Sequence, residues 1–160
     1  VRRFHRFGIH VHGMFVTGSD ADGIETIRQT ADFAIQEGLE SIQFLVLTPL
    51  PGTPLFAEMK EQGRLLTYEW AMYDTLHSVF IPKQMSAYSL MKETFDAMER
   101  VYSIRRTLRF LATGQIHYGL VSWYARSQVQ RWRKENRQLL AEAKRLAPYQ
   151  KLRGAMESQS

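Results

Sequence analysis

Three groups of residues near the N-terminus are of types and spacings that could do chemistry. His10 and His12 alternate, so on a strand they would share one face and could bind a metal ion. Two ligands are too few for a metal site, and we favour packing or hydrogen bonding for this pair. Asp20 and Asp22 could be metal ligands or general bases. Helix capping explains Asp22, since Glu25 follows three residues later as in a capping box, whereas Asp20 remains open.

The third group is the segment from Gly13 to Gly18, which ends an apolar run. Parallel α/β folds bind ligands beyond the carboxyl ends of their strands, where bare backbone lets a ring or ribose approach closely. The spacing between the two glycines is not that of a dinucleotide-binding loop. A second loop, Thr48–Pro54, contains three prolines and follows the next apolar run. It reads equally well as a rigid connector and as a wall that faces a ligand.

The elements that must position these residues alternate in type. Residues 8–18 and 41–47 have the β-branched and aromatic content of strands, and helical spacing follows each of them. The first helix begins near Ile24 and is closed by Gly38, and the second covers Leu55–Gln62. This order predicts a βαβ unit with parallel strands in an α/β fold. Such a piece leaves sheet edges uncovered, so we expect it to be a fragment of a larger protein; the missing initiator Met fits that expectation.

The character of the chain changes after Arg64. One short strand is expected at His77–Ile81, and only helical periodicity follows it. The predicted helices cover 86–102, 104–112 and about 119–147, with Pro148 ending the last one and residues 149–160 frayed.

Charge is unevenly distributed along the chain. The total of +5 combines a net −4 over residues 1–102 with a net +9 over residues 103–160. The basic tail has the composition of a surface for nucleic acid or an acidic partner. The alternation of Val129, Trp132, Leu139 and Leu146 is more typical of a packing face, and we favour that interpretation. No run is long and apolar enough to span a membrane, and the lack of cysteine suits a reducing cytoplasm.

Several motifs, taken together, resemble the radical S-adenosylmethionine (SAM) superfamily, specifically its branch with an N-terminal cobalamin-binding domain. The first is the glycine-spaced run Gly8 to Gly18 with Asp20 and Asp22. The others are the segment Leu47-Thr48-Pro49-Leu50-Pro51-Gly52-Thr53-Pro54-Leu55, the pair Gly63-Arg64, the set Trp70-x-x-Tyr73-Asp74-x-x-His77 with Pro82-Lys83, and Tyr102-Ser103. The resemblance extends over about residues 5–110.

The resemblance implies a fold and a site. Residues 9–18 and 41–48 would be the fifth and sixth strands of a partial (β/α)6 TIM-like barrel, followed by a helical C-terminal domain. The expected boundaries are 1–67 for the barrel part, 68–148 for the helical domain and 149–160 for a disordered tail. The residues implied to line the cofactor pocket are Gly13, Phe15, Val16, Gly18, Asp20, Leu47, Thr48, Pro49 and Leu50.

The implied activity is reductive cleavage of SAM for methylation or oxidoreductive modification of a small-molecule substrate. The ligands of the [4Fe–4S] cluster, in the family's C-x-x-x-C-x-x-C loop, and any cobalamin domain would belong to the upstream half of the same polypeptide, because this chain has no cysteine. The chain alone would therefore not be catalytically competent. The alternatives are a free-standing basic helical module for RNA or a protein partner, and a structural assembly domain.

Overall fold

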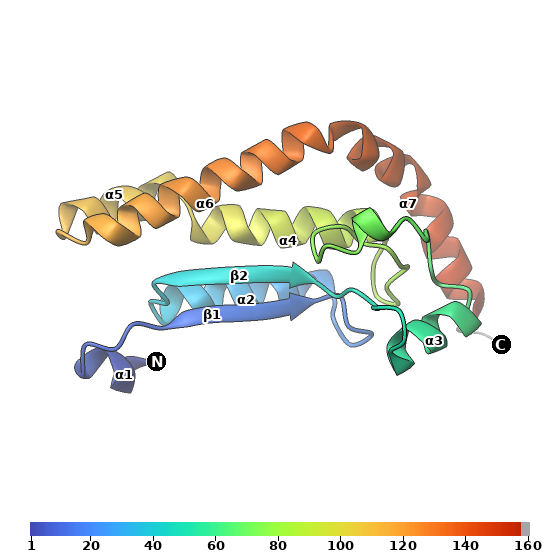
Figure 1. Ribbon diagram of the computed structural model, residues 1–160, viewed down its shortest axis with the longest axis horizontal. Coiled ribbons are helices and arrows are strands. Elements are labelled where there is room, and N and C mark those ends of the chain that lie inside the picture. The colour runs from blue at the N-terminus through green and yellow to red at the C-terminus, as the bar shows by residue number, and fades with distance from the viewer. Residues whose placement is uncertain (158–160) are drawn as a thin grey trace.

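A computed structural model of the chain describes the backbone of residues 1–157 and the side chains of residues 1–150. The chain folds as a mixed α/β structure with two strands and mostly helices (Figure 1). The elements in order are α1 (Arg2–Arg6), β1 (His12–Thr17), α2 (Ile24–Gln36), β2 (Ser41–Val46), α3 (Pro54–Glu61), η1 (Trp70–Met72), α4 (Ala87–Val101), α5 (Ile104–Ala112), α6 (Ile116–Glu135) and α7 (Arg137–Glu157).

The predicted βαβ unit is confirmed. Strands β1 and β2 pair in parallel, with His12 opposite Ser41 at one end and Thr17 opposite Val46 at the other. Gly38 ends α2 with φ of +72°, a left-handed conformation that glycine adopts without steric cost, as expected of a C′ residue. The described part of the chain holds only this two-stranded sheet, so the partial barrel stays a prediction.

The two faces of the sheet have different environments. Ile42, Phe44 and Val46 alternate along β2 and are all buried against the helices. On β1 the residues of the opposite face, Met14 and Val16, are 64% and 60% exposed. The sheet therefore covers the core with one face and leaves apolar side chains of its other face open.

The outer edge of β2, away from β1, is closed at both ends. The buried Tyr102 hydroxyl accepts a hydrogen bond from the Ile42 N–H (2.8 Å) and donates one to the Ile42 carbonyl (2.5 Å). At the other end the Val46 N–H donates to the Thr75 carbonyl (2.7 Å), with Thr75 held at φ of +64°. Within the described residues β1 pairs only with β2, so the sheet can grow only at the outer edge of β1.

Helix α4 is the centre of the molecule. It lies between the sheet and α2 on one side and α6 on the other, and α7 bends down past its N-terminal end (Figure 1). Leu90, Ala97 and Val101 belong to the main hydrophobic cluster, while Phe95 stacks on Trp132 of α6 with ring centroids 3.9 Å apart. The cluster joins residues on both sides of position 67, and the domain boundary expected there stays a prediction.

The prediction of one C-terminal helix over residues 119–147 is wrong in where the helix begins and ends, and also in its being a single helix. The segment forms two helices, α6 and α7, divided at Asn136. Pro148 lies inside α7 and does not end it. The helix continues to Glu157 through much of the tail expected to be disordered, and residues 158–160 lie outside the described part. Val129 is buried as predicted, but Leu146 is half exposed.

The short strand expected at His77–Ile81 is reduced to a single antiparallel bridge between Leu65 and Phe80. Two hydrogen bonds flank it, from the Leu66 N–H to the Val79 carbonyl and from the Ile81 N–H to the Arg64 carbonyl. Among the helices that the structure describes, none has the length and apolar content to cross a bilayer.

Replacing Tyr102 by Phe tests the closure of the β2 edge. We expect Tyr102→Phe to lower the free energy of unfolding by about 1–3 kcal/mol, because the Ile42 N–H and carbonyl would be buried without partners. Urea unfolding followed by circular dichroism measures the change. Tyr88→Phe is the matched control, since Tyr88 makes no hydrogen bond through its hydroxyl among the described contacts. Equal stability of the two variants would contradict the assignment.

Candidate functional site

The carboxyl ends of β1 and β2 lie together, as the sequence predicts for parallel strands. The Leu47 N–H donates to the Thr17 carbonyl (2.8 Å), which extends the pairing one residue into the second loop. Gly18 follows with φ of +101°, and a Cβ built there would lie 2.6 Å from Leu90 Cδ2. Glycine is therefore required at position 18 both by the backbone conformation and by the close packing of α4.

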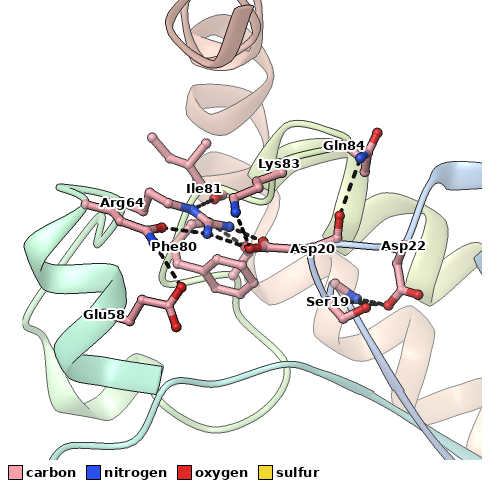
Figure 2. A network of polar contacts seen from close by, with 12 residues as sticks. Ser19, Asp20, Asp22, Glu58, Arg64, Phe80, Ile81, Lys83 and Gln84 are labelled. Carbon is pink, nitrogen blue, oxygen red and sulfur yellow. Dashed lines mark hydrogen bonds and ion pairs between the residues drawn. The ribbon is translucent and has the colours of Figure 1, made fainter. Parts of the chain in front are cut away.

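Asp22 does not cap α2, which corrects the sequence interpretation. The N-cap is Gly23, whose N–H donates to Thr26 Oγ1. The Asp22 carboxylate instead accepts from the N–H groups of Gly18 (3.0 Å) and Ser19 (2.9 Å) and so closes the loop after β1 (Figure 2). Its role here is structural, because it fixes the path of the backbone away from the strand end.

Asp20 forms a bidentate ion pair with Arg64. Arg64 Nη2 donates to Oδ1 at 2.6 Å and Nη1 donates to Oδ2 at 3.0 Å, in the fork geometry that makes such pairs strong. The Arg64 side chain is 7% exposed, and it also donates to the Ile81 carbonyl and to Gln62 (Figure 2). One guanidinium thus connects the loop after β1 with the segments after α3 and before α4.

Lys83 completes the charge balance at Asp20. Its ammonium lies 2.9 Å from Asp20 Oδ2, so the carboxylate is held by two cations. The hydrogen bond from Arg64 lowers the pKa of Asp20 below its usual value, against the effect of burial, and Lys83 lowers it further. An ionised carboxylate with two cationic partners is a poor general base, so this geometry favours a positioning role for Asp20.

The proline loop is fixed by its own contacts. Pro49 is buried, and Thr53 caps α3 by accepting the Phe56 N–H (3.2 Å) while its hydroxyl donates to the Leu50 carbonyl (2.7 Å). The Thr48 hydroxyl donates to the Val46 carbonyl (3.1 Å). Leu50 is half exposed, at the tip of a loop that is otherwise rigid.

The nine residues that the family resemblance implies as the lining of the cofactor pocket do not all point the same way. Phe15 turns to the helix side and packs on Phe44, with ring centroids 5.3 Å apart, and a Cβ on Gly13 would touch the Phe15 ring and Leu39. Val16 is exposed on the other face and Leu50 is exposed in the loop. Leu47 packs against the core, Thr48 and Pro49 follow it, and Gly18 offers backbone only. Their role in binding a cofactor stays a prediction.

A cluster of aromatic residues beside this end escaped the sequence analysis. It consists of Phe56, Tyr68, Trp70 and Tyr73, whose neighbouring rings have centroids 5.0–6.5 Å apart. Tyr68 and Trp70 are each more than half exposed, and the Tyr73 hydroxyl donates to the Thr67 carbonyl (2.8 Å). The density of aromatic residues between positions 56 and 73 was a signal, but it has no helical or strand period that would have shown a shared surface.

The segment that continues from Tyr73 is tied to α6 through His77. The Asp74 carboxylate accepts from the N–H groups of Leu76 and His77 and lies 3.0 Å from His77 Nδ1. The Asn136 amide donates to the Trp132 carbonyl, so its oxygen faces His77 Nε2 at 2.9 Å. Both ring nitrogens therefore face acceptors, and His77 links the end of β2 to the break between α6 and α7.

The N-terminal histidines make hydrogen bonds, the interpretation that the sequence favoured. His10 Nδ1 lies 3.2 Å from Glu40 Oε1 and His12 Nδ1 lies 2.8 Å from Ser41 Oγ. Within the described residues no group of three or more His, Cys, Asp and Glu side chains is placed to hold a metal ion.

Comparison with known proteins finds methyltransferases. The chain is 36% identical over 102 residues to bacteriochlorophyllide d C-12(1)-methyltransferase of Chlorobaculum tepidum, which covers 64% of this chain and 22% of that protein. It is 30% identical over 92 residues to an uncharacterized methyltransferase of Pyrococcus horikoshii, covering 58% and 20%. It is 24% identical over 101 residues to bacteriochlorophyllide d C-8(2)-methyltransferase of Chlorobaculum tepidum, covering 63% and 22%.

The chain spans about a fifth of the length of these curated relatives. No family model matches the chain, and no solved structure matches it.

Replacing Asp20 by Asn tests the ion pair with Arg64. The folded-state pKa of Asp20 is lowered, so its stabilisation is present above the ordinary value of 3.8 and is lost as pH falls through the lower folded value. We expect Asp20→Asn to cost roughly 1–2 kcal/mol at pH 7, a charged hydrogen bond discounted for partial exposure.

Denaturant unfolding at several pH values measures this difference, which should shrink below about pH 4. Asp32→Asn is the control, because Asp32 pairs with Arg100 on the open surface and should cost less. A pH-independent difference between wild type and Asp20→Asn would contradict the assigned role.

Proposed function

We propose that this chain is the C-terminal part of a radical SAM methyltransferase. The observation that carries the proposal is the 36% identity over 102 residues to a named methyltransferase, with two further methyltransferases alongside it. The parallel βαβ unit and the glycine-rich and proline-stiffened strand ends support it, since they agree with the motifs by which the sequence resembles this superfamily. The specific assignment to the cobalamin-binding branch rests on that resemblance alone.

The proposed substrate is a small molecule. Two of the relatives are named for methylation of bacteriochlorophyllide d. Methylation is accordingly the form of the reaction that we favour for the whole protein over other oxidoreductive modification.

The residues at the strand ends fit part of SAM. Val16 and Leu50 present exposed apolar surface, suitable for an adenine ring. When bound, SAM supplies the activated methyl group and the group that is cleaved reductively. The work of this chain is to bind and orient the cofactor and to exclude water from that side.

The [4Fe–4S] cluster does not fit this chain, because its ligands are thiolates and the chain has no cysteine. We place those ligands, and a cobalamin domain if one is used, in the upstream half of the polypeptide. The remaining barrel strands would join at the outer edge of β1, since the outer edge of β2 is closed by Tyr102 and Thr75. Their addition would enclose the exposed face that carries Met14 and Val16.

The segment from Arg64 to Gln84 is proposed to hold a substrate next to this site. It is fixed to the strand ends by the Asp20–Arg64 pair and by Thr75. It carries the exposed rings of Tyr68 and Trp70, which can stack on a flat conjugated ring.

The coding sequence upstream of Val1 gives the first test. We expect an open reading frame that encodes C-x-x-x-C-x-x-C within a few hundred residues. The full polypeptide, purified without oxygen and with its cluster reconstituted, should then cleave SAM in the presence of a reductant. An in-frame stop codon shortly before Val1 would contradict the proposal.

Replacing Val16 by Glu in the full polypeptide tests the pocket wall. We expect Val16→Glu to raise the Kd for SAM about tenfold or more, roughly 1.4 kcal/mol, because a carboxylate would replace an apolar contact to the ring. Equilibrium dialysis measures the Kd. Phe33→Glu on the exposed side of α2 is the control and should bind as wild type does.

Thermal unfolding of the same variants in the 160-residue chain separates a binding defect from a folding defect, and there both should unfold near the wild-type temperature because positions 16 and 33 are exposed. Unchanged SAM affinity of a folded Val16→Glu protein would place the pocket elsewhere.

A further inference from the structure

Helices α5 and α6 form an antiparallel hairpin that turns at Gly114 and projects beyond the amino ends of the strands (Figure 1). The contact between the two helices is narrow and close. A Cβ on Gly119 would lie 2.5 Å from Leu111 Cδ2, and the buried hydroxyls of Thr107 and Ser122 are hydrogen-bonded at 2.7 Å. Small and polar residues therefore occupy the helix interface, and most large apolar residues of the hairpin lie elsewhere.

Those apolar residues gather on the outside. On α5, Ile104, Leu108 and Leu111 follow at steps of four and three residues and are 55%, 60% and 43% exposed. On α6, Ile116, Leu120, Trp123 and Tyr124 share one face by the same spacing and are 60–65% exposed. We call these seven residues the apolar hairpin face.

The two helical stripes lie on the same side of the hairpin. The other side faces the rest of the protein, where Arg106 donates to the Leu39 carbonyl and Tyr118 contacts both His10 and Phe110. Around the axis of each helix, the exposed stripe is rotated by about a quarter turn from the residues of the α5–α6 interface. In both helices this rotation is away from the side that contacts the rest of the protein. The stripes thus join into one continuous apolar surface, of the kind that marks an interaction site.

The charge around this face is predominantly positive. Residues 103–134 contain seven Lys and Arg and no Asp or Glu. Arg105 and Arg109 are exposed on the edge of α5 between this stripe and a cavity that they line together with Gln36 and Glu40, and they form no ion pair with a described carboxylate. Along α6 the stripe continues from Trp123 through Ser127 to Arg131, which pairs with Glu135 at 2.8 Å, and to the exposed Lys134, again at helical spacing. The face is apolar near the hairpin turn and basic further from it.

We propose that the apolar hairpin face docks on an anionic lipid surface. Helices that lie in a membrane interface combine an aliphatic and aromatic face with a flank of Lys and Arg that meets lipid phosphates. Trp123 and Tyr124 have the amphipathic rings favoured at the level of the headgroups. The hairpin would lie on the bilayer, with the apolar hairpin face inserted and Arg131 and Lys134 at the surface.

Other occupants fit these observations less well. A symmetric pair of copies would set this predominantly basic surface against itself and bring like charges together. RNA would use the cations, but it gives no reason to expose Ile104, Leu108, Ile116 and Leu120, whose burial in hydrocarbon is favourable. Strands of an upstream segment would join at the outer edge of β1, and the hairpin instead follows the helix whose C-cap, Tyr102, closes β2.

Binding to lipid vesicles tests the proposal. We expect the chain to sediment with phosphatidylcholine vesicles that contain about one-third phosphatidylglycerol and to remain free with pure phosphatidylcholine. The double variant Leu108→Glu with Leu120→Glu should lower the bound fraction at least tenfold, and Arg105→Gln with Arg109→Gln should lower it several-fold. Added salt should weaken binding because the attraction is partly electrostatic.

Two control variants have matched exposure elsewhere: Phe33→Glu on α2 and Lys60→Gln on α3 should both bind as wild type does. Circular dichroism establishes that every variant is folded, and light scattering after size exclusion reports the oligomeric state. The proposal is overturned by equal binding to neutral vesicles, by no binding to either, or by a dimer that the double glutamate variant dissociates. Single-stranded RNA that binds the chain and displaces it from the vesicles would also overturn it.

Discussion

The arrangement of the carboxyl ends of the strands depends on the burial of one guanidinium, that of Arg64. A buried charge is tolerated only when it is paired and its hydrogen bonds are satisfied. Arg64 meets this demand with Asp20, Gln62 and the Ile81 carbonyl, which come from three separate segments. Because none of these partners can leave without a cost, the loop after β1, the end of α3 and the approach to α4 are held in one geometry.

A second constraint acts on the sheet itself, since the outer edge of β2 is closed. Tyr102 and Thr75 satisfy backbone groups on the outer edge of the strand, so that edge offers no place for a further strand at either end. The edge of β1 and the face bearing Met14 and Val16 have no comparable cover within the described residues. The asymmetry gives the sheet one direction of growth, and it is the direction that the proposed barrel requires.

Local patterns predicted the elements better than their contacts. The parallel pair, α2 with its closing Gly38, and the positions of α4 and α5 follow from period and glycine placement. The role of Asp22 was missed because its partners are backbone N–H groups four and three residues before it, which a capping motif does not encode. Pro148 was predicted to end the last helix, but α7 continues through it. The role of Arg64 gave no local signal in the sequence, because its partner Asp20 lies 44 residues away.

The two proposals belong to opposite ends of the same strand. Most of the predicted cofactor residues lie toward the carboxyl ends of β1 and β2, and α5 begins shortly after Tyr102, which is bound where β2 begins. Six residues of strand span about 20 Å, so a bilayer at the hairpin would lie well apart from the reacting centre. Insertion of the hairpin would leave the strand ends facing water or an upstream segment.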